Sequence, residues 1–461
     1  MDYIKKIIES WNKTDNCINS NSEIFKWIQD LNKATEIEIK ESTIINDTFW
    51  FYDDYRGEIL NRRRSFFSII GMREFIDGRF VQEQPVIIQP EIGYLGIICK
   101  EIEGVLYFLM QAKIEPGNIN CVQISPTIQA TKSNFTRAHG GKLPMYFDYF
   151  ENSQKYHVIY DQIQSEQSGR FYKKRNRNMI MVVDKEIVVH PNFKWMTLGQ
   201  IKSLMKHDNL VNMDTRTVLS GIPFLWGTGV YEDSFAEQLF KDKSLYNSIF
   251  KPDSLEYLPK LFQKINNYKM FSDIRHETVP LYELADWKIN EYGMESLKHA
   301  DFMVRFYNIN ISGREVQKWT QPLFKATGKA TFGLLTKVQD NCRLFLVKIK
   351  PEIGTFDKVE IGPSIQWEPS HLLNNTSDKV ELWFEKYMDE QKKTLVDVML
   401  SEEGGRFYHE QNRNVIVEID EDIKQLPQDY MWVNYSTINF LIQTNNNVNI
   451  QLRNLLSLID M

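Results

Sequence analysis

The chain of 461 residues contains the same sequence pattern twice, and this repeat restricts the folds open to it. The segment that begins at Gln84 aligns without a gap with the segment that begins at Gln321. Of the 48 aligned positions 14 are identical, and the same offset relates Trp50 to Trp287. A repeat of this length indicates two copies of one folded unit, which can bury their apolar faces against each other.

A second motif is repeated at nearly the same spacing. The stretch SEQSGRFYKKRNRN over Ser165–Asn178 returns as SEEGGRFYHEQNRN over Ser401–Asn414, with the offset shortened by a single position. We therefore expect a first domain at residues 1–235 and a second domain at residues 250–461, joined through the region near residues 230–255. Length alone would fit two to four domains, and the repeat reduces these to two copies of one fold.

Both copies show the same order of predicted elements. An amphipathic helix at residues 24–33, or at residues 257–269 in the second copy, precedes several strand-like runs. These runs are Phe66–Ile70, Leu95–Cys99 and Leu106–Gln111 in the first copy, and Gly333–Thr336 and Leu344–Ile349 in the second. Another strand follows the NRN motif, and a closing helix comes after it. This order predicts the α+β class, with a mixed β-sheet flanked by helices in each copy.

The composition excludes several classes of protein. With 10 Trp, 21 Tyr and 28 Phe, the chain is expected to collapse into a core rather than stay disordered. A net charge of −6 predicts no nucleic-acid partner, and the lack of an apolar run of about 18 residues predicts no membrane span. Four cysteines without a CxxC pair indicate reduced thiols and a cytoplasmic protein.

No cofactor is expected either. The eight histidines form neither HxH nor HExxH, which argues against zinc, although spacing alone leaves open Mg²⁺ held by carboxylates. No GxGxxG opens a predicted helix, which argues against a nicotinamide cofactor, and neither a phosphate-binding GxxxxGKS/T loop nor a GxSxG elbow occurs. We therefore expect a protein without a metal or a redox cofactor.

The densest group of polar residues lies between Gln111 and Gly140. Two predicted strands meet there at a Pro-Gly-Asn turn, and a loop then brings hydroxyl, amide, guanidinium and imidazole groups together. Many short hydrogen bonds of this kind suit a diphosphate or a sugar, although a solvated loop would have a similar composition. The candidates are Lys113, Glu115, Asn118, Gln129, Thr131, Lys132, Ser133, Asn134, Arg137 and His139. For Lys113 and Glu115, which both copies keep, a buried ion pair is an equally good interpretation.

The repeated SEQSGRF motif and the residues after it supply a second group of candidates. These are Ser165, Glu166, Arg170, Phe171, Asn176 and Arg177. Arginine and asparagine can hold a phosphate or a ribose, and Phe171 or Tyr172 can stack on a base. Because both copies keep the motif, a role of Arg170 and Asn178 in the fold is equally consistent with the sequence.

The two copies differ most where the first is rich in polar groups. The first copy reads QPEIG at Gln89–Gly93 and ATKSNFTRAHGG at residues 130–141, where the second reads ATGKA and WEPSHLLNN. The second copy thus lacks equivalents of four polar residues, Glu91, Asn134, Arg137 and His139. This difference predicts chemistry in the first copy. The second copy would serve structure or ligand binding, with Trp319 and Trp367 as candidates for lining an apolar or base-stacking pocket.

Together these motifs resemble one known family. QPEIGYLGI, QAKIEPGN, SPTIQATKSNFTRAHGG, QSEQSGRFYKKRNRN and, in the second copy, GREVQKWTQPL are similar to the NDP-hexose 2,3-dehydratases of deoxysugar biosynthesis. The resemblance covers nearly the whole chain, and it implies two Nudix-like domains and a homodimer. The string of metal-binding carboxylates of a Nudix hydrolase is missing here, which fits a family that uses the fold for other chemistry.

The resemblance also implies a substrate and a reaction. The substrate would be dTDP-4-keto-6-deoxy-D-glucose, which loses water across C2–C3 without a redox cofactor. Its C4 ketone acidifies the C3 proton, so that a base, an acid and donors to the enolate suffice. The product would be a 3,4-diketo-2,6-dideoxy sugar nucleotide, which a downstream 3-ketoreductase would consume.

Within this reaction the candidate residues take different roles. His139 and Glu91 are the candidates for base and acid, in either order, because only the first copy has them. The remaining assignments are Arg137 and Lys132 for the diphosphate, Thr131, Ser133 and Asn134 for the sugar or the enolate oxygen, and Lys113, Glu115, Asn118 and Gln129 for the wall of the site. Two other functions stay open: a nucleotide-sugar binding protein without catalysis, and a Nudix-like hydrolase with relocated carboxylates.

Overall fold

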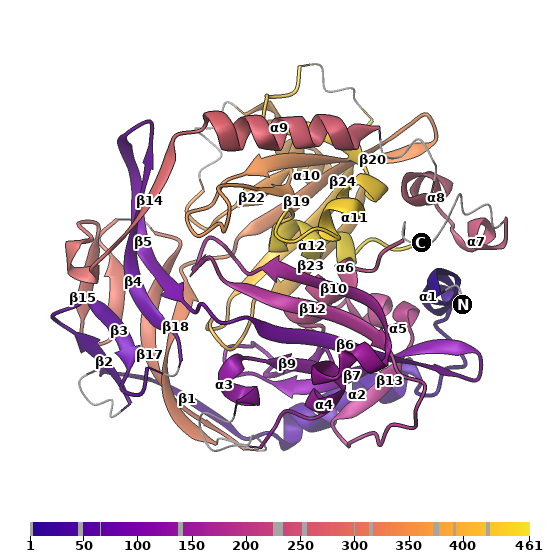
Figure 1. The fold of residues 1–461 in the computed structure, drawn as a ribbon, viewed down its shortest axis with the longest axis horizontal. Coiled ribbons are helices and arrows are strands. Elements are labelled where there is room, and N and C mark those ends of the chain that lie inside the picture. The colour runs from indigo at the N-terminus through magenta and orange to yellow at the C-terminus, as the bar shows by residue number, and fades with distance from the viewer. Residues whose placement is uncertain are drawn as a thin grey trace.

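The computed structural model describes most of the chain. The described residues are 3–44, 49–64, 66–136, 142–224, 234–250, 256–298, 300–312, 317–371, 378–390, 393–420 and 425–461. Within these residues the strands form four β-sheets, two of seven strands and two smaller ones (Figure 1).

Each half of the chain builds one seven-stranded sheet. The first contains β6 (Gly93–Ile102), β7 (Val105–Ile114), β8 (Val122–Ser125), β9 (Ile128–Ala130), β10 (His157–Ser165), β12 (Arg175–Val182) and β13 (Phe193–Met196). The second contains β19 (Thr331–Gln339), β20 (Cys342–Lys350), β21 (Glu360–Pro363), β22 (Ile365–Trp367), β23 (Thr394–Ser401), β24 (Gln411–Glu418) and β25 (Tyr430–Asn434). One pair in each sheet is parallel, β12 with β6 and β24 with β19, and the other pairs are antiparallel. The mixed sheets and the α+β class predicted from the sequence are confirmed.

The two smaller sheets lie at one side of the molecule. One contains β2 (Trp50–Asp53), β3 (Glu58–Asn61), β4 (Ser68–Ile76), β5 (Arg79–Ile88), β11 (Phe171–Tyr172) and β14 (Ile274–Val279). The other contains β1 (Ile37–Ser42), β15 (Trp287–Asn290), β16 (Gly293–Ser296), β17 (Phe302–Ile311) and β18 (Lys318–Ala326). Their facing sides share one apolar core, in which Trp50 and Phe67 of the first half meet Phe302 and Phe324 of the second.

Each half lends one strand to the small sheet of the other half. β1 pairs antiparallel with β17, from Ile37 opposite Ile311 onward, and β14 pairs antiparallel with β4, from Ile274 opposite Ile76 onward. The first residues of β1 and β14 are separated by the same offset as Gln84 and Gln321, so the exchange follows the repeat. Figure 1 shows β14 beside β4 and β5, and β1 running toward β17. The two copies are therefore interleaved rather than placed side by side.

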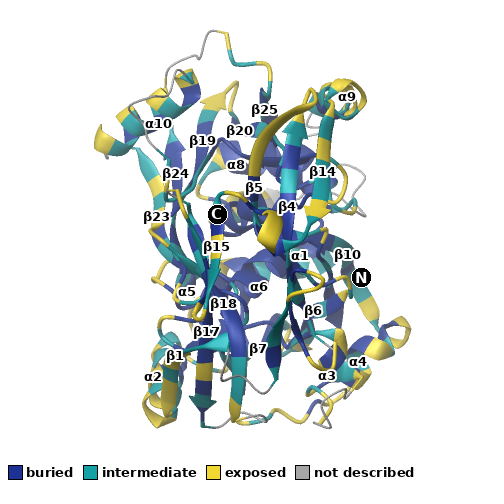
Figure 2. Cartoon of the chain, turned by 90° about the vertical axis from the view of Figure 1, so that its left-hand side faces the viewer, coloured by how far each residue is buried: buried dark blue, intermediate teal, exposed yellow. Residues whose placement is uncertain are grey.

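The helices divide into peripheral and central ones. They are α1 (Tyr3–Asn12), α2 (Asn21–Ala34), α3 (Lys132–Phe135), α4 (Phe147–Glu151), α5 (Leu198–Leu204), α6 (Met213–Ser220), α7 (Ser234–Leu239), α8 (Lys243–Phe250), α9 (Tyr257–Phe271), α10 (Lys379–Glu390), α11 (Tyr435–Ile442) and α12 (Ile450–Ser457). In Figure 2, α2, α9 and α10 carry exposed residues at the periphery, whereas α6 is buried in the middle. α2 and α9 are the two amphipathic helices expected from the sequence.

The central helices α6 and α12 contact each other and are buried along their whole length. Each carries one buried arginine that reaches the other half of the chain. Arg216 donates from Nη2 to the main-chain oxygen of Ser401 at 2.7 Å, and Arg453 donates to the main-chain oxygen of Ser165. Because the two arginines are themselves repeat partners, these bonds are related by the repeat. These bonds connect the start of each GRF loop, residues 165–171 in the first copy and residues 401–407 in the second, to the opposite copy.

The repeat also extends to the first helix of each half. Ser10 of α1 donates from Oγ to the main-chain oxygen of Leu106 at 2.6 Å, and accepts from the N–H of Leu198 at 3.0 Å. Ser248 of α8 donates to the oxygen of Arg343 at 2.6 Å and accepts from the N–H of Tyr435 at 2.7 Å. Since α8 takes the place of α1, we propose that the second copy begins before residue 250.

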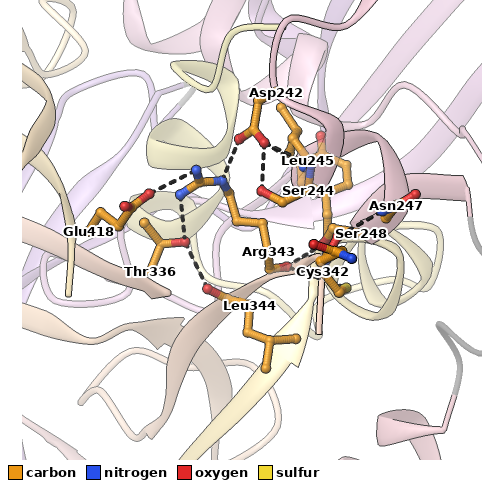
Figure 3. A network of polar contacts seen from close by, with 12 residues as sticks. Asp242, Ser244, Leu245, Asn247, Ser248, Thr336, Cys342, Arg343, Leu344 and Glu418 are labelled. Carbon is orange, nitrogen blue, oxygen red and sulfur yellow. Dashed lines mark hydrogen bonds and ion pairs between the residues drawn. The ribbon is translucent and has the colours of Figure 1, made fainter. Parts of the chain in front are cut away.

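The second half adds an ion-pair network at this junction (Figure 3). Arg343 of β20 donates from Nε to Asp242, which precedes α8, at 2.7 Å, and its Nη2 lies 2.9 Å from Glu418 of β24. Leu106 occupies the equivalent position in the first half, so this network belongs to the second half alone. It fastens α8 to the second large sheet.

Two further expectations concern the chain as a whole. All four cysteines are free thiols, as the sequence predicted. Among the described residues, no helix is both long and apolar enough to cross a membrane.

Candidate active site

A cavity of about 950 Å³ opens where the first large sheet meets the two small sheets. Its wall includes residues of β6, β7, β9, β12, α3 and α6 of the first half, and residues of β17, β18 and the loop at 403–406 of the second half. A volume of this size is in the range of cavities that bind small ligands. The cavity thus belongs to both halves, although most of the candidate residues named from the sequence come from the first.

The pair Lys113 and Glu115 lies on this wall at the end of β7. Lys113 Nζ is 3.6 Å from Glu115 Oε1 and donates to the main-chain oxygen of Gln129 at 3.1 Å. Gln129 Nε2 donates to the same carboxylate oxygen at 2.9 Å. Glu115 Oε2 is buried without a hydrogen-bond partner among the described residues. Lys113 and Glu115 therefore form the ion pair that the sequence analysis offered as an alternative to ligand binding, and they are also part of the cavity wall.

Two more carboxyl groups lie on the wall beside this pair. Glu166 accepts a hydrogen bond from Asn176 Nδ2, and its Oε2 is buried without a partner among the described residues. Asp214, the second residue of α6, is 2% exposed, and its Oδ1 is likewise unpartnered within the described part of the chain. Lys174 is buried near Glu166 and donates from Nζ to the main-chain oxygen of Glu91 at 2.5 Å.

The second half contributes a fourth carboxyl group and a guanidinium. Both come from the loop that carries SEEGGRF, which the first half holds by two main-chain hydrogen bonds. Gly117 N–H donates to the oxygen of Gly404 at 2.7 Å, and Gly117 oxygen accepts from the N–H of His409 at 2.7 Å. Glu403 and Arg406 thereby reach the cavity wall. Arg406 Nη2 donates to Gln89 Oε1 of the first half at 2.9 Å.

Arg170 is not part of the cavity wall, and its contacts fit the alternative interpretation from the sequence, a role in the fold. Arg170 donates from Nη2 to Glu368 of the second half at 3.1 Å, and its guanidinium lies over the ring of Phe302. Arg406 has the corresponding position over Phe66 and Phe67. The physical reason is that each GRF loop crosses into the opposite half. The arginine that serves the first half's cavity is therefore encoded in the second copy of the motif.

Nine of the 15 substrate-binding candidates named from the sequence line the cavity. They are Lys113, Glu115, Gln129, Thr131, Ser133, Asn134, Glu166, Phe171 and Asn176. The structure thus brings the two predicted polar groups together in one place, although they belong to separate segments of the chain.

Four other candidates have their contacts elsewhere. Arg177 forms a bidentate ion pair with Asp161 and lies behind Tyr94, whose hydroxyl it contacts at 3.2 Å. Ser165 donates to Glu360 of the second half at 2.9 Å. Asn118 lies in the turn next to Gly404, and Lys132 is exposed at the start of α3. Arg413 and Asp397 repeat the Arg177 ion pair in the second half, which favours a role in the fold.

The two candidates for acid–base chemistry are placed differently. Glu91 is close to the cavity without being part of its wall: its carboxylate accepts from Gln89 Nε2, and its main-chain oxygen accepts from Lys174. His139 lies outside the described residues, as does Arg137. Their roles stay predictions.

The small sheets add aromatic rings and cations to the wall that sequence reasoning mostly missed. Trp319 of β18, one of the two tryptophans named from the sequence, lines the cavity together with Trp50 of β2. The other, Trp367, stacks on His371 with ring centroids 5.3 Å apart and is not on the wall. The additional cations on this side are Lys40, Arg63 and Lys318. Only the strand exchange and the packing of the small sheets bring these residues to the cavity.

The buried carboxyl groups of this site have raised pKa values. Burial raises the pKa of Glu403 to about 7, against the opposing charge of Arg406. Burial, with the neighbouring charges of Glu166 and Glu403, raises the pKa of Asp214 well above its ordinary value. Burial also raises the pKa of Glu166 and lowers the pKa of Lys174. The site can therefore hold protons on carboxyl groups near neutral pH, as general acid catalysis requires.

These shifts predict how stability depends on pH. Burial also raises the pKa of Glu410 to about 8. In the folded chain Asp214, Glu403 and Glu410 therefore keep protons that the unfolded chain releases near pH 4. Stability from such groups is present below the unfolded pKa and is lost as pH rises through the folded pKa. We expect the free energy of unfolding to fall by at least about 1.4 kcal/mol between pH 6 and pH 8.5.

Urea unfolding at a series of pH values measures this dependence. Glu410→Gln cannot ionise at that position, so the slope against pH should become shallower in this variant. A stability that is flat or rises between pH 6 and pH 8.5 would contradict the prediction.

Comparison with known proteins agrees with the two-part organisation. The model of the NDP-hexose 2,3-dehydratase family matches residues 21–222 and again residues 259–459. The chain belongs to this family.

Its relatives are similar over their whole length. The dTDP-4-dehydro-6-deoxy-alpha-D-glucopyranose 2,3-dehydratase of Saccharopolyspora spinosa is 33% identical over 460 residues, covering 98% of this chain and 94% of the relative. Proteins of the same name from Amycolatopsis orientalis and Streptomyces violaceoruber are 32% and 33% identical, covering 100% and 95% of this chain and 94% and 97% of their own lengths. Among solved structures, an ADP compounds hydrolase matches 32% of this chain and 77% of its own, with 11% identity and a TM-score of 0.19. That similarity is too low to carry an argument.

Proposed function

We propose that this protein removes water across C2–C3 of dTDP-4-keto-6-deoxy-D-glucose and yields a 3,4-diketo-2,6-dideoxy sugar nucleotide. The observation that carries the proposal is the composition of the cavity. In a chain of this family, it places four carboxyl groups, Glu115, Glu166, Asp214 and Glu403, among the cations Lys113, Lys174 and Arg406. The names of the full-length relatives support the same substrate.

The reaction needs groups that this cavity contains. A base removes the C3 proton, and the electron pair moves into the C4 ketone as an enolate, which cations or N–H donors stabilise. The enolate then re-forms the ketone, its electrons make the C2=C3 bond, and the C2 hydroxyl leaves with a proton as water. The resulting C3 enol takes up a proton at C2 and becomes the second ketone. No electrons enter or leave overall, so the sum of the steps is loss of one water.

Two ends of the cavity suit two parts of the substrate. The acidic cluster with Lys113 and Arg406 suits the sugar and its developing enolate. The rings of Trp50 and Trp319 and the cations Arg63 and Lys318 suit a base and a diphosphate. Arg137 and Lys132 stay our candidates for further diphosphate contacts.

His139 and Glu91 remain our candidates for base and acid. We expect His139→Ala and Glu91→Gln each to lower kcat at least 100-fold with an unchanged melting temperature, since a positioned acid or base contributes about 10²–10⁴-fold. Trp367→Phe is the control, because Trp367 contacts His371 away from the cavity, and it should retain more than half of the activity. Near-normal rates in both site variants would refute these roles.

One assay separates the competing functions. The protein is incubated with dTDP-4-keto-6-deoxyglucose, a 3-ketoreductase and reduced nicotinamide, and the products are separated by chromatography. A 2,6-dideoxy sugar nucleotide supports the dehydratase. Binding without turnover would support the nucleotide-sugar binding protein, and Mg²⁺-dependent release of dTMP would support a hydrolase.

The proposal includes the surroundings of the enzyme. The diketo product is reactive, which favours a 3-ketoreductase acting directly after it. A homodimer and a cytoplasmic location complete the proposal. Sedimentation velocity would test the dimer.

A further inference from the structure

The repeat allows the cavity to be compared with the equivalent place in the second half. Two of its carboxyl groups recur there: Glu352 matches Glu115, and Glu402 matches Glu166. Their contacts recur as well, since Gln366 donates to Glu352 at 2.8 Å and Asn412 donates to Glu402 at 2.7 Å. Carboxylates that both halves hold in the same way belong to the shared fold.

The other two carboxyl groups are specific to the cavity. Asp214 corresponds to Gln451, because Asn212 and Asn449 cap α6 and α12 in the same manner and fix the register. Glu403 corresponds to Gln167 in the GRF motif of the first half. Because the GRF loops cross between the halves, the second half supplies Glu403 to the cavity, and the first half supplies Gln167 to the equivalent place in the second half. An alignment shows this only as a conservative Glu/Gln difference.

The two specific carboxyl groups differ in access. Asp214 is 2% exposed at the start of the buried helix α6, whereas Glu403 is half-buried on the crossing loop. Both residues line the cavity, Glu403 is the more exposed of the two, and Asp214 is within electrostatic range of it. Around Glu403 lie the cations Arg406, Lys113 and Lys174 and the carboxyl groups of Glu115, Glu166 and Asp214.

We propose that Glu403, supplied by the second half of the chain, is the general acid that protonates the departing C2 hydroxyl. In this step the Glu403 O–H gives its proton to the C2 oxygen while the C2–O bond breaks and the enolate electron pair forms the C2=C3 bond. Water leaves, and the Glu403 carboxylate takes a proton from solvent before the next turnover. The proposal rests on the dehydratase function proposed above. It assigns the acid role to Glu403 in place of one of His139 and Glu91, which then stay candidates for removing the C3 proton.

The surroundings of Glu403 keep a large fraction of its carboxyl groups protonated near neutral pH. Burial raises its pKa to about 7, and the charges of Glu115 and Glu166 act in the same direction, against Arg406. At pH 7 about half of the molecules would hold the proton that the leaving hydroxyl needs. Turnover should therefore decline as pH rises above about 7, because the acid form is lost.

The decisive variant is Glu403→Gln, which keeps the shape of the side chain and cannot donate the proton. We expect kcat to fall at least 100-fold and the alkaline decline of kcat to disappear. Exchange of the C3 hydrogen with solvent, followed by NMR of the substrate in D₂O, should persist, because proton removal at C3 does not need Glu403. Glu410→Gln is the matched control: the same loop region bears this buried glutamate, but its charge partner is Arg170 rather than a cavity residue, and turnover should stay within about twofold.

A second pair of variants covers the case in which Glu403→Gln does not fold. A methyl group on Gly405 would overlap the Glu403 carboxylate, whereas a methyl group on the equivalent Gly169 would have its nearest contact at 3.4 Å. Gly405→Ala should lower kcat at least 10-fold by displacing the carboxylate, and Gly169→Ala should leave it unchanged.

The outcomes are distinct. Near-normal turnover in Glu403→Gln, or in Gly405→Ala if the first variant is unfolded, overturns the assignment. Loss of C3 exchange together with turnover also overturns it, because Glu403 would then act before the leaving-group step. An inactive wild-type chain would instead refute the proposed dehydratase function itself.

Discussion

Replacing Gly117 by alanine should reduce turnover at least 100-fold and lower the melting temperature by several degrees. The added methyl group would overlap the main-chain oxygen of Phe407 and lie 2.6 Å from that of Gly404. Backbone atoms cannot move aside as the end of a side chain can. The loop that carries Glu403 and Arg406 must therefore withdraw from the first half and take both residues away from the cavity.

Gly354→Ala provides the matched comparison. Gly354 is the repeat partner of Gly117, and its methyl group would overlap the main-chain oxygen of Phe171 in the reciprocal loop. Both variants should lose similar stability, because the clash is the same. Gly354→Ala should lose less turnover, since its loop positions Arg170 and Phe171, whereas Glu403 and Arg406 stay in place. Equal turnover in the two variants, measured per folded molecule, would contradict the crossing-loop account of the site.

Replacing Arg453 by methionine should lower the free energy of unfolding by about 3–5 kcal/mol, the range for breaking a buried charge network. The Arg453 side chain is 0% exposed and donates to the main-chain oxygens of Val448 and Ser165. Methionine fills similar space but leaves these acceptors unpaired, and it removes the positive charge near Glu166 and Glu360. Because Arg453 joins the two halves, the loss should affect the whole molecule.

Urea unfolding at pH 7 measures this loss. Arg413→Met serves as the control, because Arg413 forms an exposed ion pair with Asp397, and such pairs contribute at most about 1 kcal/mol. An Arg453→Met variant within about 1 kcal/mol of the wild type, no more than an exposed ion pair contributes, would show that the central contact between α6 and α12 does not depend on this arginine.

Several elements of the fold could be predicted from local sequence. The helices α2 and α9 follow from their amphipathic periodicity, and β6, β7, β19 and β20 follow from short apolar runs. Strand ends were less certain: the run expected at Phe66–Ile70 is part of β4, which extends from Ser68 to Ile76. The exchange of β1 and β14 could not be predicted, because either strand would satisfy its own half's sheet equally well in a sequence pattern.

The site was predictable only in part, for a related reason. Comparison of the two copies was used to find residues that the second copy lacks, and this directed attention to the first copy. It named Glu91, Asn134, Arg137 and His139. Of these, Asn134 lines the cavity, Glu91 lies close to it, and Arg137 and His139 lie outside the described residues. Arg170 was named from the motif that both copies keep, on the assumption that each motif serves its own copy, whereas the structure places Arg406 on the cavity wall. A self-alignment contains the useful signal, the Gln167/Glu403 difference, but gives it no special weight.

The sequence by itself determined the duplication, the α+β class and the polar segments that contribute to the cavity, because these depend on periodicity and on identity at a fixed offset. It also identified the family by resemblance, and the comparison with known proteins confirmed this. Only the tertiary structure showed which residues of each half line the cavity. Two reciprocal exchanges, of the strands β1 and β14 and of the GRF loops, bring residues from opposite halves of the chain into one cavity. Such contacts depend on packing between the halves, which has no local signature in the chain.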